Sequence, residues 1–320
     1  MNKGKFVISL DFELFWGLAG WGKEQLLAYQ PRIEGAIDAL YRILEVFKKY
    51  DIKCTIAFVG GIYKSSREDF LASAPTLKPS YVNRLFSSYD LLLSLVKDDV
   101  ISERLLFRPD VVEQLQKNPL VELGSHTFSH FYALEDGQTI DEFKVDIVKA
   151  QIEAKEKGLI LKSIIFPRNQ IPQSYHKVCA RAGFTHIRGN EESLLYRSES
   201  TPSRFDIRRI LRLLDCYLNI TGHHTYKSPR KDVLIDVTAS RFLRPYSRSL
   251  RFIEPLKVRR VLKDIEYAAR HGHIYHLWWH PHNFGIYTEE SIMQLEKICK
   301  DFANMRNKYN MESCFMCDIK

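Results

Sequence analysis

The chain has 320 residues, of which 45% are hydrophobic and 27% are charged, and its formal net charge is +8. These values are those of an ordinary globular protein with a sizeable core. No apolar run reaches the roughly 18 residues that a membrane span requires, and the start MNKGKFVISLDFEL has too short an apolar part for a secretory signal. We therefore expect a cytoplasmic protein.

Short apolar runs alternate with longer amphipathic ones, which is the rhythm of a parallel α/β protein. The runs predicted to be strands are Phe6–Leu10, Cys54–Val59, Leu120–Leu123, Ser163–Phe166, Thr185–Arg188, Val233–Val237, His273–Trp279 and, near the end, Cys314–Ile319. Helical spacing of apolar residues occurs in Ile33–Tyr50, Asp141–Lys157, Gln173–Ala182, Pro255–His271 and Glu289–Arg306. Seven or eight such repeats favour a barrel over an open sheet.

We predict a single domain, residues 1–320, with two segments added to the barrel frame. The first, about 60–119, is long and helical, and the second, about 202–255, is basic and punctuated by proline. Both follow the C-terminal ends of predicted strands, where the βα loops of a barrel build the active site.

The first predicted strand runs into a pair of carboxylates in the stretch SLDFEL. Asp11 and Glu13 lie two residues apart, so their side chains point to the same side of a strand. Two converging carboxylates are costly unless a positive charge balances them. A metal ion would do so, with one carboxylate as ligand and the other as a base. A polar strand end paired with arginines is the alternative.

The third predicted strand ends in GSHTFSH, which holds two histidines four residues apart. On a helical turn capped by Ser125, His126 and His130 would lie on one face and could share a divalent ion. Pairs of this kind also occur by chance in a chain with 11 histidines. Either carboxylate of SLDFEL would complete a set of two histidines and one carboxylate, which is a ligand set of catalytic metal sites.

The stretch SIIFPRNQ ends the fourth predicted strand in polar residues. Arg168 could pair with the free carboxylate and hold it ionised, as a base requires. A surface arginine is the alternative.

The late run HIYHLWWHPHNFG is predicted to be a strand that Pro281 ends. His276, Trp278 and His280 would then face one way, at the mouth of the barrel. A histidine in that place could protonate a leaving group, and we assign this role to His280. His282 lies just past the strand, where it would contact substrate or hydrogen-bond within the loop.

Two smaller clusters carry weaker signals. His223 and His224 in GHHTY would point in different directions on a strand, so they are a weak alternative metal site. Cys314 and Cys317 form a lone CxxC, which we interpret as ordinary buried or edge-strand residues because no second pair accompanies it.

A basic segment interleaved with aromatic residues lies between residues 241 and 260. Its members are Arg241, Arg244, Arg248, Arg251, Lys257, Arg259 and Arg260, with Phe242, Tyr246 and Phe252 between them. A solvated helix face is the first interpretation, and an anionic substrate or peripheral contact with an anionic membrane is the alternative. No nucleic-acid motif accompanies the segment, so we expect no nucleic-acid partner.

In their order along the chain, SLDFEL, GSHTFSH, SIIFPRNQ and WWHPHNFG resemble the motifs of the polysaccharide deacetylase superfamily (NodB homology, carbohydrate esterase family 4), in a divergent branch. The resemblance implies a distorted (β/α)7-type barrel with helical and basic insertions in its βα loops. It also implies a role for each motif residue: Glu13, His126 and His130 as metal ligands, Asp11 as base, Arg168 as its tether and His280 as acid. The chain departs from the family pattern in reading D-F-E for two adjacent aspartates and F-P-R for R-x-P.

The reaction that this resemblance implies is metal-dependent hydrolysis of an N-acyl group, in the first place N-acetyl, on an amino sugar of a glycan or glycan precursor. We expect zinc, with cobalt or nickel as alternatives, and substrate contacts from Trp278, Trp279, His282 and Asn283. A nucleotide-linked or lipid-linked sugar would suit the expected compartment and the basic segment. Two other functions stay open: hydrolysis of another C–N bond, such as a formyl amide or ureide, and an inactive barrel that binds glycan or membrane.

Overall fold

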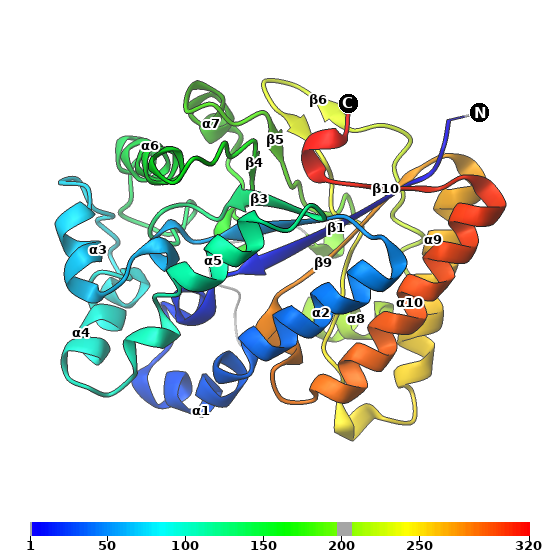
Figure 1. Cartoon of the computed structure of the whole chain (residues 1–320), viewed down its shortest axis with the longest axis horizontal. Helices are drawn as coiled ribbons and strands as arrows, with labels where there is room; N and C mark the ends of the chain where they lie inside the picture. The colour runs from blue at the N-terminus through cyan, green and yellow to red at the C-terminus, as the bar shows by residue number, and fades with distance from the viewer. Residues whose placement is uncertain (1, 197–206) are drawn as a thin grey trace.

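The computed structural model describes residues 2–196 and 207–320 of the chain. Its strands form one curled sheet in the order β6-β7-β5-β4-β3-β2-β1-β9-β8, with β10 beside β1, and all pairs except β6–β7 are parallel. The strands are β1 (Lys5–Phe12), β2 (Cys54–Phe58), β3 (Val121–Ser125), β4 (Ser163–Ile164), β5 (His186–Ile187), β6 (Arg230–Lys231), β7 (Ile235–Asp236), β8 (Arg241–Phe242), β9 (Ile274–Trp279) and β10 (Glu312–Cys314). Figure 1 shows β1 crossing the middle of the molecule.

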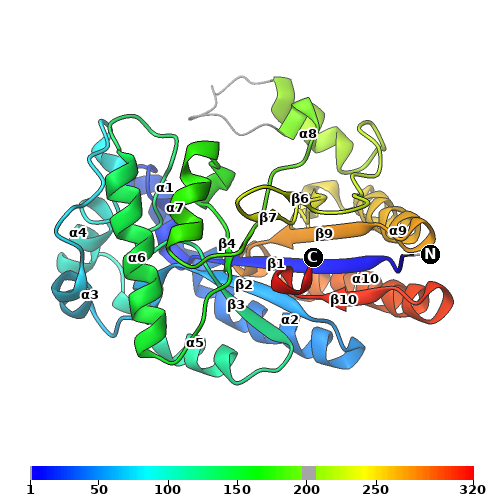
Figure 2. The same cartoon turned by 90° about the horizontal axis from the view of Figure 1, so that it is seen from above.

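The helices lie outside this sheet. They are α1 (Lys23–Glu34), α2 (Ala36–Tyr50), α3 (Arg67–Ser73), α4 (Leu91–Lys97), α5 (Pro109–Gln116), α6 (Ile140–Glu156), α7 (His176–Arg181), α8 (Ile207–Asp215), α9 (Glu254–His271) and α10 (Thr288–Tyr309). Figure 2 shows α2, α5 and α10 on one side of β1 and α7 and α8 on the other. No helix of the described residues is long and apolar enough to cross a membrane.

The predicted distorted barrel is confirmed, and an observed strand overlaps each predicted one. The predicted bounds of one strand and one helix were wrong. Most of Cys314–Ile319 is not a strand, because β10 ends at Cys314 and a 3-10 helix follows. The helix predicted over Ile33–Tyr50 is broken at Gly35, where the chain passes so close to the loop after β9 that a Cβ would lie 2.1 Å from the Gly285 carbonyl oxygen.

One continuous stretch, residues 235–242, joins the two edges of the curled sheet. The amide of Val237 donates to the Ile187 carbonyl of β5, and three residues later the amide of Ser240 donates to the His276 carbonyl of β9. The C-terminal ends of the parallel strands therefore surround one opening. The stretch lies within the segment predicted as the second insertion, of which residues 202–206 fall outside the described residues.

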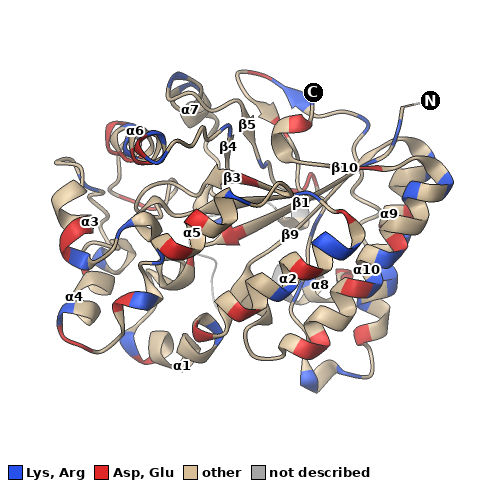
Figure 3. Cartoon of the chain, in the orientation of Figure 1, with Lys and Arg blue, Asp and Glu red and all other residues tan. Residues whose placement is uncertain are grey.

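Part of the basic segment is buried rather than solvated. Arg241, only 4% exposed, forms ion pairs with Asp215 and Asp264, and Arg260 of α9 also pairs with Asp264. Lys257 is buried as well and pairs with Glu254. On the helices, acidic and basic residues are mixed along α9 and α10 (Figure 3). Neither a solvated face nor a single anion-binding patch describes the whole segment.

We expect Asp264→Ala to lower the free energy of unfolding by about 3–5 kcal/mol, because it leaves two buried guanidinium groups without their shared carboxylate. The control is Glu312→Ala, which removes the partner of the exposed Lys3 and should cost less than about 1 kcal/mol. Urea unfolding of both variants measures the difference. Equal losses would show that the buried ion pairs add nothing to stability.

Candidate active site

The candidate site lies where three parallel strands end. Asp11 is near the end of β1 and Glu13 follows it, His126 follows β3, and His280 follows β9. Strand β1 pairs in parallel with both β2 and β9, and β2 pairs in parallel with β3. Side chains more than a hundred residues apart in sequence therefore meet at one opening of the barrel.

Glu13, His126 and His130 form a buried group around one point. Glu13 Oε2 lies 3.0 Å from His130 Nε2 and 3.3 Å from His126 Nε2. All three ligand atoms lie within 4.8 Å of one another. Burial opposes ionisation of Glu13, but His280, His126 and His130 hold its pKa well below the usual range. The structure thus brings together the three ligands that the sequence resemblance implied.

The donor atoms of this group fit a cation. His126 Nδ1 donates to the Ile165 carbonyl at 2.9 Å, so in the neutral ring Nε2 presents a lone pair toward Glu13, and within the described residues it has no hydrogen-bond partner. Burial lowers the pKa of His130 to about 4, although the nearby Glu13 carboxylate raises it, so this ring is neutral at pH 7. A nitrogen lone pair and a carboxylate oxygen that face each other in a buried place repel unless a positive charge lies between them.

The turn that carries the two histidines is not helical, so the predicted helical turn is wrong. After β3 the backbone of Thr127 and of His130 has φ values of 63° and 60°, a region that residues with side chains rarely adopt. The expected hydrogen bond to Ser125 is present, since its Oγ accepts from the Thr127 amide at 3.1 Å. The irregular turn, and not the period of a helix, directs both rings toward Glu13.

A buried carboxylate on α6 holds this turn. Asp146 accepts hydrogen bonds from the amides of Phe128 and Ser129, at 2.7 and 3.1 Å, and from the Ser129 hydroxyl. Burial raises its pKa to about 6, although these hydrogen bonds favour the carboxylate. Sequence reasoning did not single out Asp146, because a polar residue on a helix gives no sign of which loop it faces.

The carboxylate of Asp11 is held by Arg188, which sequence reasoning missed. Arg188 Nη1 and Nη2 donate to Asp11 Oδ1 and Oδ2 at 2.6 and 2.7 Å, and the arginine is buried. Nη1 also donates to Ser9 and Nη2 to Asn169. Burial opposes ionisation of Asp11, but Arg188, with His126 and His280, lowers its pKa below the usual value. A signal existed, because Arg188 ends a predicted strand as Asp11 and Arg168 do.

Arg168 does not pair with Asp11, and the predicted tether is therefore corrected to Arg188. Arg168 Nη2 donates to the Ala19 carbonyl at 2.9 Å, and Nη1 lies 3.6 Å from Glu135. Its guanidinium lies over the ring of Tyr132, 4.4 Å from the centroid. The backbone of Arg168 has a φ of 52° after Pro167, which turns the side chain away from the end of β1 and along the cavity wall.

His280 faces the two carboxylates from the opposite side of the site. Its Nε2 lies 3.4 Å from Glu13 Oε1 and 3.7 Å from Asp11 Oδ2. The Oδ1 atom of Asn283 is 3.3 Å from His280 Nδ1 and accepts from the His280 amide, so Asn283 orients this ring. His282 stacks on His280 with 4.8 Å between ring centroids, and with Glu13 and His280 it forms a second group that could hold a metal.

The two tryptophans of β9 point in opposite directions. Trp278 lies on the same side as His276 and lines the site, where the Arg188 guanidinium covers its ring at 4.1 Å. Trp279 is fully buried and packs on Phe284. The predicted substrate contact of Trp279 is therefore wrong, because adjacent residues of a strand face opposite sides of the sheet.

The weaker clusters lie away from this site. His223 pairs with Asp264 at 2.7 Å, and His224 contacts the Thr221 carbonyl. In the described part of the chain, both groups that could hold a metal contain Glu13, so the alternative site at GHHTY is not supported. Cys314 is buried on β10, as expected for an ordinary core residue, and Cys317 is half-buried just after it.

A cavity of about 380 Å³ opens over the site. Asp11, Glu13, His130, His280 and His282 are among its lining residues. A substrate group in this cavity would reach both carboxylates and the three histidines at once.

Residues 35–187 match the family model for polysaccharide deacetylase. This match covers 153 of the 320 residues and supports the predicted resemblance to the polysaccharide deacetylase (NodB-homology) superfamily. The match to this deacetylase family includes His126, His130 and Arg168, whereas Asp11, Glu13 and His280 lie outside it. No curated protein sequence matches the chain.

Solved structures of the superfamily fold resemble this chain throughout its length. A protein from Mycobacterium smegmatis assigned as a polysaccharide deacetylase is 10% identical, with a TM-score of 0.59 over 99% of this chain and 89% of that one. PuuE allantoinase is 11% identical, with a TM-score of 0.54 over 98% and 88%. A protein from Pseudomonas aeruginosa PAO1 assigned as a polysaccharide deacetylase is 10% identical, with a TM-score of 0.51 over 95% and 91%. At such identities the likeness shows the fold.

We expect Asp146→Ala to weaken zinc binding about 10- to 100-fold, because the His126–His130 turn loses the carboxylate that fixes its amides. Competition with a chromophoric chelator measures the affinity. The matched control is Asp141→Ala, which removes an exposed carboxylate from the same helix and should leave zinc affinity unchanged. Unaltered affinity in both variants would contradict the positioning role of Asp146.

Proposed function

We propose that the chain is a metal-dependent hydrolase that removes an N-acyl group, in the first place N-acetyl, from an amino sugar in a glycan or glycan precursor. The match to the polysaccharide deacetylase family model supports a deacetylase or a related amidohydrolase. The observation that carries the metal dependence is the His126 Nε2 lone pair, which faces the Glu13 carboxylate at 3.3 Å without a hydrogen-bond partner among the described residues.

Glu13, His126 and His130 would hold a divalent cation, with zinc as the first candidate and cobalt or nickel as alternatives. Such an ion, when bound, supplies Lewis-acid polarisation of the acyl carbonyl and a water of lowered pKa. The neutral state of His130 and the ionised state of Glu13 are the protonation states that ligands need.

Asp11 is the proposed base. Its bidentate pair with Arg188 keeps it ionised and fixes both oxygens, so it can accept a proton from a water held beside Glu13. His280 is the proposed acid, because its Nε2 lies within 4 Å of both carboxylates and its ring is oriented by Asn283. Trp278, which lines the cavity, offers a surface for the sugar. His282 also lines it and is proposed as a further substrate contact.

The direct test is acyl release from a panel of substrates by metal-stripped and zinc-loaded protein. We expect zinc to restore activity on N-acetylated amino sugars and Asp11→Asn to lower it about 10²- to 10⁴-fold at unchanged metal content. Asp38→Asn, on the exposed face of α2, is the control.

The same panel separates the alternatives. Turnover of a formyl amide or a ureide without turnover of any N-acetyl sugar would replace the proposed substrate by another C–N bond. If the protein binds no metal, turns over no substrate and has the same metal content after His126→Ala, the proposed enzyme is contradicted and an inactive barrel is the remaining interpretation.

Replacing the arginine that holds the base should move the pH dependence. Asp11 must be ionised to act, and Arg188 lowers its pKa, so activity is lost as the pH falls through that lowered value. In Arg188→Gln the pKa of Asp11 rises, and we expect the acid limb of kcat/KM to shift to higher pH. In Arg168→Gln the limb should stay in place whatever the rate, since Arg168 does not touch Asp11. A shift in the Arg168 variant alone would reverse the assignment.

A further inference from the structure

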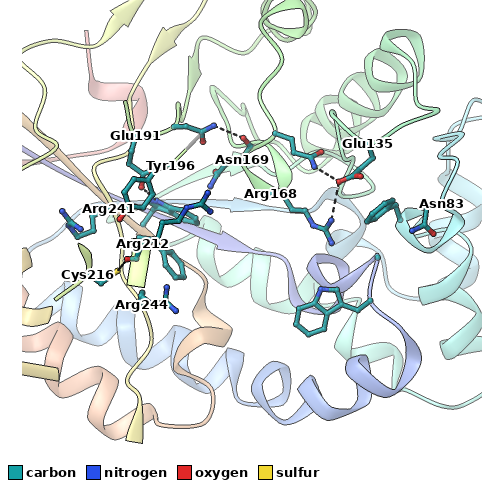
Figure 4. A pocket seen from close by; sticks show the side chains of 17 residues that line it. Asn83, Glu135, Arg168, Asn169, Glu191, Tyr196, Arg212, Cys216, Arg241 and Arg244 are labelled. Atoms are coloured by element: carbon teal, nitrogen blue, oxygen red, sulfur yellow. Dashed lines mark hydrogen bonds and ion pairs between the residues drawn. The ribbon is translucent and has the colours of Figure 1, made fainter. Parts of the chain in front are cut away.

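A second, larger cavity of about 830 Å³ adjoins the catalytic cavity and shares part of its wall. The shared residues are Trp21, Arg168, Asn169, Phe242 and Trp278. Figure 4 shows the side chains that line it: Asn83, Glu135 and Arg168 gather at one end, and Tyr196, Arg212, Arg241, Arg244 and Cys216 at the other. A bound molecule could therefore extend from the proposed metal ligands to the second, arginine-rich end.

Among the described residues, two of the three arginines at this end have no carboxylate partner. Arg241 is neutralised by Asp215 and Asp264. Arg244, which is half-buried, has no carboxylate within ion-pair distance among the described residues, and neither does Arg212, whose Nε donates to the Leu195 carbonyl. In the part of the chain that the structure describes, two guanidinium groups thus line one end of a cavity without a carboxylate at ion-pair distance.

Arg241 is a third arginine at this end, but its guanidinium is largely enclosed by the protein. Arg241 is 96% buried, being 4% exposed, and its Nη2 has no hydrogen-bond partner in the described part of the chain. Of the two carboxylates that line the cavity, Glu135 faces Arg168 at the opposite end, and Glu191 is near Trp278 with a pKa that burial raises.

Forked guanidinium groups recognise phosphate oxygens by paired, charge-assisted hydrogen bonds. The wall between the two ends is aromatic, since Phe242 and Trp278 lie with ring centroids 4.7 Å apart and both line the two cavities. This arrangement suits an amino sugar joined to an anion, with the sugar on the aromatic wall and the anion at the arginines.

We propose that Arg212 and Arg244 bind the phosphate of a phosphate-linked amino sugar whose N-acyl group reaches Asp11 and Glu13. The inference rests on the proposed function and narrows its substrate to sugars that carry a phosphate ester. A nucleotide and a lipid carrier both present this phosphate group to the arginines.

Binding without turnover tests the arginines first. Calorimetric titration with inorganic pyrophosphate, at fixed ionic strength, should give an affinity that falls about tenfold or more in Arg244→Gln and in Arg212→Gln. The matched control is Arg251→Gln, an exposed arginine outside this cavity, which should bind pyrophosphate like the unmodified protein. Because the Arg244 side chain has no described partner, this variant should also keep its unfolding temperature. Equal affinities in all four proteins would overturn the phosphate site.

Turnover then distinguishes the two sources of phosphate. The substrates are UDP-N-acetylglucosamine, N-acetylglucosamine linked to farnesyl phosphate, and neutral tri-N-acetylchitotriose. We expect kcat/KM to be highest for one of the two phosphate-linked sugars. Arg244→Gln should lower kcat/KM for that sugar about tenfold and leave kcat/KM for the neutral sugar unchanged.

The failures are separable. Hydrolysis of the neutral sugar with equal or higher kcat/KM would leave the proposed deacetylase function in place and overturn this inference. Pyrophosphate binding that depends on Arg244, with no hydrolysis of any acylated sugar, would support the phosphate site and contradict the proposed function.

Discussion

Two carboxylates buried at the end of β1 impose the constraint on which the site depends. Asp11 and Glu13 are each less than 10% exposed, and neither can stay ionised there without positive charge or hydrogen-bond donors nearby. The two are balanced by different partners, since Arg188 donates to both oxygens of Asp11 whereas Glu13 faces imidazoles. This difference gives the two carboxylates different chemistry, one fixed as a base and one left for a cation.

The supporting residues make that arrangement rigid. Asp146 of α6 accepts hydrogen bonds from backbone amides of the turn that carries His126 and His130, and so fixes that turn. Asn283 orients the ring of His280. The backbone conformation of this turn is strained, because Thr127 and His130 both have positive φ. Strain of this kind at a strand end persists because packing around it leaves no other position, and it is typical of functional sites.

Much of the site could be predicted from the sequence because polar residues at the ends of apolar strands are conspicuous. Asp11, Glu13, His126, His130 and His280 all stand there, and the structure brings all five together. The same rule failed for Arg168 and Arg188, which both end predicted strands. The choice between them depends on a φ of 52° at Arg168, which the periodicity of residues does not express. Trp279 was misplaced although alternation along its strand already puts it on the face opposite His276, Trp278 and His280.

The sequence by itself determined the alternation of strands and helices, and with it the barrel and the edge where the chemistry lies, because hydrophobic periodicity is a local property. Only the tertiary structure decided which arginine holds Asp11, that residues 235–242 join the two edges of the sheet, and that Arg212 and Arg244 line a cavity next to the site. These features depend on contacts between residues far apart in the chain, whose geometry is set by packing and by the balance of buried charge.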